Sequence, residues 1–356
     1  MNFKKTILSA LLGLVLFSSC ENNEPKIKSS PGAFDNGILI LNQGVFLSGN
    51  ASVSYLSNDF STSENDIFTT INPSLMLGDT GQDIGFYNDL AFIVVNVSNK
   101  IEIVNRYSFK HLATITLGLN NPRYIAFCDG KGYVTNWGDG TNTTDDFVAV
   151  LNLENYTVTS TIAVVEGPEK IVVKDKNLYV AHQGGFGFGN SLSVINATSN
   201  TVSKSIIVGD LPNSLRIENN NLYVLCGGKP YYATVETSGA LLKINLADNT
   251  VTSTLNFADL KHPNNLNIYE NKLYYNINNQ IFKTELSATT LPTSAFITLD
   301  FGAKTNLNNF EVNNNVLFAA DATDFNSNGK VYVYGLDAKL QKTFIVGIAP
   351  CGFYFN

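Results

Sequence analysis

The sequence has no cluster of positively charged residues. Its 23 lysines and arginines are outnumbered by 30 aspartates and glutamates, so the formal net charge is −7 at pH 7 and the isoelectric point is about 5.0. A protein that binds nucleic acid needs clustered Lys and Arg to neutralise the phosphates. The charge distribution therefore argues against a nucleic-acid partner.

Cysteine pairs and metal-ligand clusters are also lacking. The cysteines beyond Cys20 are Cys128, Cys226 and Cys351, and no two of them form a CxxC pair. An odd number of separated cysteines predicts buried free thiols, with one unassigned disulfide as the alternative. The histidines are His111, His182 and His262. None has a partner at the helical or hairpin spacing that a zinc site requires, so we expect no zinc.

Catalytic motifs are missing as well. The sequence contains no G-x-S-x-G nucleophile motif. The glycine-rich stretch at 184–189 lies between two expected strands, whereas a dinucleotide fingerprint requires a helix directly after the glycines. We therefore expect a protein that is not an enzyme and that has no cofactor.

An apolar run lies at the N-terminus, and no second run approaches eighteen residues. Lys4 and Lys5 precede this apolar segment at 7–17, which is too short to span a bilayer. It ends in Phe17-Ser18-Ser19-Cys20, which resembles a lipobox. We predict a lipoprotein signal peptide at 1–19 and lipidation of Cys20, with an ordinary secretory signal as the alternative.

Residues 20–35 are polar and contain Pro25 and Pro31, which predicts a flexible tether. Glu21 and Glu24, just after the cysteine, resemble the export signal that sends Bacteroidetes lipoproteins to the cell surface. We therefore expect a protein held in the outer membrane by its lipid alone and exposed at the cell surface. A periplasm-facing anchor is the alternative.

The remaining chain contains an internal repeat. Each unit has four short runs of β-branched and aromatic residues separated by Asn, Asp and Gly turns, which predicts four strands per unit. An aromatic residue recurs in the second run at intervals of 41 to 51 residues. These anchors are Phe92, Tyr133, Tyr179, Tyr223, Tyr274 and Phe318. A period of this length with four strands is typical of β-propeller blades, because one sheet must stack on its neighbours to cover its faces.

The two ends of the repeat region predict a seventh blade. Residues 349–356 read as the innermost strand of another unit, and residues 37–40 read as a second strand without an inner partner. Pairing them closes the ring and removes an exposed sheet edge. The predicted fold is therefore all-β, a seven-bladed propeller of four-stranded blades over 36–356. A ring of six or eight blades is the alternative.

The repeated unit resembles that of the YncE-like seven-bladed propellers. It reads Pro-x-x, then Asn-Leu-Tyr-Val, then Val-Ile-Asn, and closes with Ile-x-Val-Gly, as at 168–209. Together with the lipobox, it resembles the surface-exposed cobamide-binding (BtuG-type) propeller lipoproteins of Bacteroidetes. This resemblance implies capture of a cobamide such as vitamin B12 and its delivery to a TonB-dependent outer-membrane transporter.

Two groups of residues are expected on one face of the propeller. The loops between second and third strands carry glycine-flanked aromatics, which suit a large, flat and partly polar ligand. These aromatics are Trp137, Phe186, Phe188, Tyr231 and Tyr232. Packing of these rings back onto the propeller is the alternative.

The second group follows the residue that opens each unit, at the mouth of the central channel. It consists of Gln82, Arg123, Glu169, Asn213, Asn264, Asn308 and Cys351. We expect these mostly polar side chains to bind polar groups of the ligand, and a solvated channel rim is the alternative.

Two other functions stay open. The same face could bind a protein or a glycan, which would make the propeller a scaffold. Alternatively, Glu169, Asn213 and Asn264 offer oxygen atoms of the kind that calcium prefers, as in propeller lactonases. Those enzymes usually have six blades, and no acid or base partner is evident.

Overall fold

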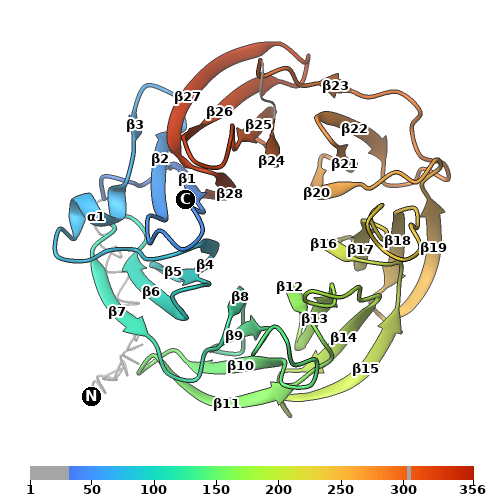
Figure 1. Ribbon diagram of the computed structural model, residues 1–356, viewed down its shortest axis with the longest axis horizontal. Helices are drawn as coiled ribbons and strands as arrows, with labels where there is room; N and C mark the ends of the chain where they lie inside the picture. The colour runs from blue at the N-terminus through green and yellow to red at the C-terminus, as the bar shows by residue number, and fades with distance from the viewer. Residues whose placement is uncertain (1–31, 303–305) are drawn as a thin grey trace, which may run out of the picture. The chain divides into compact units, whose positions relative to one another are not determined.

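The computed structural model describes residues 32–302 and 306–356. The signal peptide, Cys20 and most of the predicted tether lie outside the described residues. Gly32–Asn356 form one compact unit. This unit is a seven-bladed propeller of four-stranded antiparallel sheets, as the repeat predicts (Figure 1).

Blades one to four contain the following strands. Blade one consists of β28 (Pro350–Phe355), β1 (Gly37–Asn42), β2 (Ser52–Ser57) and β3 (Ser63–Glu64). Blade two consists of β4 (Gly81–Tyr87), β5 (Leu90–Val95), β6 (Lys100–Asn105) and β7 (His111–Ile115). Blade three consists of β8 (Pro122–Cys128), β9 (Lys131–Asn136), β10 (Phe147–Asn152) and β11 (Thr157–Ala163). Blade four consists of β12 (Pro168–Lys174), β13 (Asn177–His182), β14 (Ser191–Asn196) and β15 (Thr201–Ile207).

Blades five to seven complete the ring. Blade five consists of β16 (Pro212–Glu218), β17 (Asn221–Cys226), β18 (Ala240–Asn245) and β19 (Thr250–Asn256). Blade six consists of β20 (Asn264–Tyr269), β21 (Lys272–Ile277), β22 (Gln280–Glu285) and β23 (Ile297–Thr298). Blade seven consists of β24 (Leu307–Asn313), β25 (Val316–Asp321), β26 (Asn328–Gly335) and β27 (Leu340–Ile348). One short helix, α1 (Ile67–Ile71), packs against β2.

The first and second strands of several blades are joined by two-residue turns in which both residues have positive φ. These turns are Asp129-Gly130, Asn219-Asn220, Glu270-Asn271 and Asn314-Asn315. Turns of this type match the twist of the flanking strands and favour Asn, Asp and Gly. The Asn and Asp residues that separate the strands of the repeat are therefore the local cause of its tight hairpins.

The C-terminal strand closes the ring, as predicted. In the register of β28 on β1, Ile38 faces Phe355 and Ile40 faces Phe353. Each innermost strand also contacts the innermost strand of the next blade, around the full circle from β4 to β28 and back to β4 (Figure 1). The first and the last strand of the described ring therefore share one sheet.

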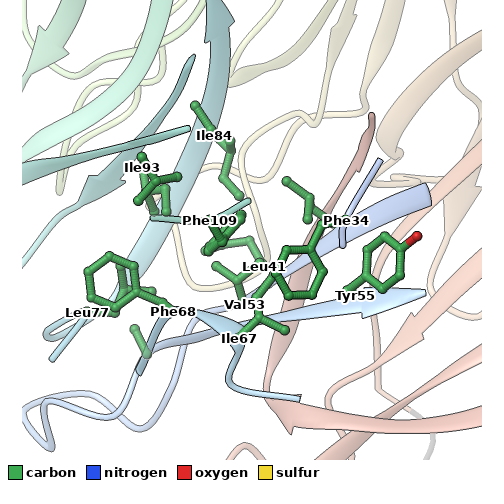
Figure 2. Close-up of a cluster of buried hydrophobic side chains, with 14 of the residues drawn as sticks. Phe34, Leu41, Val53, Tyr55, Ile67, Phe68, Leu77, Ile84, Ile93 and Phe109 are labelled. Atoms are coloured by element: carbon green, nitrogen blue, oxygen red, sulfur yellow. The ribbon is translucent and has the colours of Figure 1, made fainter. Parts of the chain in front are cut away.

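The hydrophobic core lies between the blades. All six aromatic anchors of the repeat are buried there. Figure 2 shows the cluster between blades one and two, where Ile67 and Phe68 of α1 pack beside Val53 and Phe109. The hydroxyl groups of two tyrosine anchors reach the next blade: Tyr133 donates to Asn200 at 3.0 Å, and Tyr179 donates to Asn249 at 2.8 Å. The anchors thus join blades by both apolar and polar contacts.

The ordered ring begins slightly before residue 36. Gly32 to Asp35, which the sequence assigns to the tether, lie against it: Phe34 is 1% exposed and its amide donates to Tyr107 O at 2.9 Å. Cys128, Cys226 and Cys351 are free thiols. Among the described residues, no helix is long and apolar enough to cross a membrane.

Candidate functional site

A polar pocket of about 470 Å³ lies at one end of the central channel. All seven innermost strands contribute to its lining. The structure thereby brings together every residue of the predicted channel rim. These residues are Gln82, Arg123, Glu169, Asn213, Asn264, Asn308 and Cys351.

A β-bulge in each blade shapes this mouth. The pairing of every innermost strand with its neighbour shifts register at the residues that line the pocket. A bulge places two residues opposite one, which breaks the alternation of side chains. Successive residues can therefore both line the pocket, as Arg123 with Tyr124 and Glu169 with Lys170 do.

The same bulge explains which rim residues the sequence-based prediction missed. A regular strand presents every second side chain to one face, so only one rim position per blade was expected. The structure adds Tyr124, Lys170, Asn265 and Asn309. The repeated proline or glycine at the start of most inner strands is the one sequence signal for the irregularity.

The loops that carry the aromatics are fixed to the mouth by a repeated hydrogen bond. The first residue after the second strand donates its backbone N–H to a carbonyl oxygen. That oxygen belongs to the residue directly before the innermost strand of the same blade. Examples are Trp137 to Asn121 at 3.2 Å and Gly227 to Leu211 at 2.8 Å. The bond recurs in blades one, two, four and seven, and among the described residues blade six alone lacks it.

Arg123 and Glu169 form the central ion pair of the rim. Arg123 donates to Glu169 through Nε at 2.8 Å and through Nη2 at 2.7 Å. Its guanidinium also stacks on Trp137, 4.2 Å from the ring centroid. Burial opposes the charge of Arg123, but the adjacent Glu169 carboxylate outweighs that effect and raises the pKa of Arg123. The two side chains therefore hold each other in a fixed geometry.

This pairing disfavours the alternative of a calcium site at the rim. Both carboxylate oxygens of Glu169 already accept hydrogen bonds from Arg123. The oxygen of Asn213 accepts a hydrogen bond from Ser214 at 3.0 Å. No group of three or more His, Cys, Asp or Glu side chains suited to a metal converges among the described residues. A cation would have to displace Arg123 from a bidentate contact.

On blades five and seven, the rim asparagines bridge to the next blade. Asn213 Nδ2 donates to Pro263 O at 2.9 Å, and Asn308 Nδ2 donates to Pro350 O at 3.0 Å. Asn309 Nδ2 donates to Cys351 O at 2.5 Å. These bonds orient the amide groups, and no described residue donates to the side-chain oxygens of Asn308 and Asn309. Blade seven therefore offers hydrogen-bond acceptors at the rim.

A charged layer lies below the rim and was not predicted. Lys170 Nζ lies 3.7 Å from the centroid of the Tyr124 ring. Asp83 accepts hydrogen bonds from Tyr354 Oη and Ile125 N, both at 3.0 Å. Burial raises the pKa of Asp83, although Lys170 and these two hydrogen bonds oppose the shift.

A second ion pair, Arg216 with Glu311, lies deeper in the central channel. Arg216 donates to Glu311 at 3.1 Å, and burial raises the pKa of Glu311 against the attraction of Arg216 and Lys170. The ammonium of Lys170 thus adds a positive charge to the pocket floor, across from the acceptor side of the rim.

The five predicted aromatics form a wall beside this pocket. Tyr232 lines the pocket itself. Trp137 and Phe186 line an adjoining cavity of about 420 Å³ that also includes Arg123. The rings contact one another in two groups: Trp137 with Phe186, at 6.0 Å between centroids, and Tyr232 with Phe188 and Tyr231, at 6.4 and 5.5 Å.

These aromatic side chains differ in solvent exposure. Tyr231, Phe186 and Tyr232 are 82%, 77% and 72% exposed, and Phe188 is partly so. Trp137 is half-buried against Arg123, so the alternative of loop packing applies to it in part. Its indole Nε1 is buried and has no acceptor among the described residues.

The histidines contribute little to the pocket. His182 is buried and hydrogen-bonded to Ser193 at 2.8 Å, and burial lowers its pKa to about 4. His111 contacts Glu102 at 3.0 Å on blade two. His262 lines the pocket edge, where its ring nitrogens contact Gly227 O at 2.8 Å and Glu236 at 3.0 Å.

Comparison with known proteins identifies a family and a fold. The family described as "Domain of unknown function (DUF5074)" matches residues 36–315. No curated protein matches the sequence. A quinonprotein alcohol dehydrogenase-like protein from Bacteroides thetaiotaomicron is similar in structure, with a TM-score of 0.66 and 13% identity over 90% of this chain and 78% of that one.

Two further solved structures are similar. A functionally unknown protein from Desulfotomaculum acetoxidans has a TM-score of 0.63 and 14% identity, over 90% of this chain and 98% of that chain. BamB from Moraxella catarrhalis has a TM-score of 0.52 and 11% identity, over 88% and 84%. At these identities the similarity concerns the propeller alone, and the neighbours differ in function.

Proposed function

Since the chain belongs to the DUF5074 family, we propose its function from its own site: the protein captures a cobamide at the channel mouth and passes it to a transporter. The main support is that hydrogen-bond acceptors, positively charged side chains and exposed aromatic rings meet at one end of the central channel. Asn308 and Asn309 supply the acceptors, Lys170 and Arg123 the positive charge, and blades three to five the exposed rings.

A corrinoid suits this arrangement chemically. It is a large, flat ring whose edge carries amide groups, which both donate and accept hydrogen bonds. The amide N–H groups would meet the oxygens of Asn308 and Asn309, and the amide oxygens would meet Lys170 and the Asn264 amide. Ligand pockets usually measure about 300–1,000 Å³. At about 470 Å³, this pocket would admit only part of the ligand, which would lie across the mouth against the aromatic wall.

The N-terminal sequence and the resemblance of the repeat support the proposed location and partner. The lipobox-like ending at Cys20 supports an anchor in the outer membrane, and Glu21 and Glu24 support exposure at the cell surface. The resemblance to cobamide-binding propellers supports a TonB-dependent transporter as the recipient. We propose binding without catalysis, because both oxygens of the rim carboxylate Glu169 are engaged by Arg123.

Calorimetry with cyanocobalamin on the Gly32–Asn356 unit tests the proposal. We expect saturable binding, accompanied by a shift of the corrinoid absorption bands. Val202→Ala, on the outer strand of blade four, should leave the affinity unchanged. No heat and no spectral shift at micromolar ligand would remove the cobamide from consideration. Co-purification with an outer-membrane receptor in the absence of any corrinoid would instead favour a protein-binding scaffold.

A further inference from the structure

A second cleft, of about 510 Å³, lies over blade six beside the channel mouth. The connection between β21 and β22 is the two-residue turn Asn278-Asn279, whereas the corresponding loops of blades five and seven are longer. Blade six also lacks the hydrogen bond that fixes the loop base in the other described blades. The short turn leaves a hollow between its neighbours. We propose that this cleft is a separate subsite for an uncharged saccharide.

The lining of the cleft is polar and nearly free of charge. Five asparagines line it together with His262, Leu307 and Phe325, and none of these described lining residues is an acid, a lysine or an arginine. The asparagines are Asn264, Asn276, Asn278, Asn279 and Asn306. The channel mouth differs, because Arg123, Glu169 and Lys170 line it. A neutral ligand rich in hydrogen-bonding groups fits the cleft better than an ion, which would find no opposite charge among the described lining residues.

The amide groups are oriented by the backbone around them. Asn279 Nδ2 donates to Leu299 O at 2.7 Å, and Asn306 Nδ2 donates to Thr323 O. Their oxygens remain as acceptors. Asn264 is turned the other way, because its oxygen accepts from Asn265 N at 3.0 Å and its Nδ2 remains as a donor. Fixed donors and acceptors side by side suit sugar hydroxyls, since a hydroxyl both donates and accepts.

Phe325 supplies an apolar surface at the edge of the cleft. The residue has φ 60° and is fixed by its N–H bond to Ala322 O at 2.9 Å, and its side chain is 44% exposed. A flat aromatic ring beside amides matches the two surfaces of a sugar ring, which has apolar C–H faces and a polar edge. The cleft therefore has both components of a saccharide subsite.

His262 separates the cleft from the channel mouth. It lines both cavities, and its ring is fixed between Gly227 O and Glu236. Asn264 also borders both. A saccharide could therefore occupy the cleft without entering the mouth. The saccharide subsite goes beyond cobamide capture and does not depend on it.

An array of neutral and acidic oligosaccharides, probed with Gly32–Asn356, tests the subsite. We expect binding to at least one neutral glycan, and the same oligosaccharide free in solution should give saturable calorimetry. Binding only to immobilised glycoprotein and not to the free sugar would place the saccharide on a protein partner. Binding to no neutral glycan, or only to acidic ones, overturns the inference.

Substitutions at the cleft sharpen the test. Phe325→Asn removes the ring while keeping a residue that tolerates positive φ, and it should weaken glycan binding about tenfold, or about 1.4 kcal/mol. Asn278→Gly keeps the backbone and removes an exposed amide. Tyr231→Ala is the matched control, since it removes an exposed ring outside this cleft. Unchanged glycan affinity in Phe325→Asn, with an unchanged melting temperature, would contradict the assignment.

The two binding functions can fail separately. Phe325→Asn should leave cyanocobalamin affinity unchanged, because Phe325 does not line the channel mouth. Tyr231→Ala should weaken cyanocobalamin and spare the glycan. Loss of both ligands in either variant would instead indicate one shared site.

Discussion

At the scale of single residues, Arg123 is held between an acid and an aromatic ring. Glu169 binds two of its nitrogens, and Trp137 covers one face of the guanidinium. Removing one partner of a buried ion pair leaves the other charge without compensation, which costs more than removing both. Rim residues that face the ligand therefore also contribute to folding.

We expect Glu169→Gln to lower the free energy of unfolding by about 3 kcal/mol, and Arg123→Met with Glu169→Gln to recover part of the loss. Urea unfolding measures both. The exposed pair Lys176–Asp129 is the control, because Lys176→Gln should cost less than about 1 kcal/mol. A double variant less stable than Glu169→Gln would show that the charge pair is not the cause.

Asp146 predicts a pH dependence of stability. Burial raises its pKa from 3.8 to about 6, against the hydrogen bond from Gly167 N, with Asp145 and Glu166 adding to the rise. Because the folded-state pKa exceeds the unfolded value, the folded protein binds the proton more tightly. This contribution to stability is present at low pH and is lost as the pH rises through about 6.

Asp146→Asn should therefore be more stable than wild type at pH 7, by on the order of 2 kcal/mol, and the difference should vanish near pH 4. Unfolding at several pH values measures it. His182, whose pKa is lowered to about 4, has the opposite pH trend, and it cancels in the difference because both proteins contain it. A difference that grows toward low pH would contradict the prediction.

At the scale of elements, the loops and the inner strands differ in how far the sequence reveals them. The glycine-flanked aromatics predicted the loops beside the channel mouth, because glycine is unfavourable inside a strand and indicates a loop. The charged layer was missed, because Lys170 and Tyr124 follow directly after the predicted rim residues and a regular strand would turn them away. The bulge that turns them inward depends on pairing with the second strand, which the sequence does not state.

The blade-five loop provides a test of the aromatic wall. Tyr232→Ala and Tyr231→Ala should each weaken cyanocobalamin binding by about 1–2 kcal/mol without changing the melting temperature, because both rings are exposed. Trp137→Ala should weaken binding and also lower the melting temperature, since it removes the contact with Arg123. Calorimetry and thermal unfolding separate the two effects. Equal melting losses in all three variants would mean that the tyrosines are packed.

At the scale of the whole molecule, the ring depends on one strand from the far end of the chain. β28 supplies the innermost strand of blade one and places Phe353 in the core between blades one and seven. The repeat and the incomplete units at both ends were enough to predict this closure. The blade count and topology were therefore readable from the sequence, whereas the side-chain partners across blades were not.

Deleting residues 350–356 should abolish cooperative unfolding and promote aggregation, because the edge of β1 and the apolar faces of blades one and seven become exposed. A peptide of residues 350–356 added in trans should restore a single transition. The same peptide with Phe353→Asp should fail to do so. Cooperative unfolding of the truncated chain without any peptide would show that closure is dispensable.

The bulge at the start of each inner strand has a consequence for how the family can diversify. Because the register shift frees one or two positions in each blade from the apolar core, these side chains can be exchanged while the strand pairing and the aromatic anchors stay the same. Related chains could thus acquire new ligand specificities by substitution of these bulge residues in each unit. A library of variants restricted to the bulge residues would be an economical way to redesign the binding specificity of this propeller.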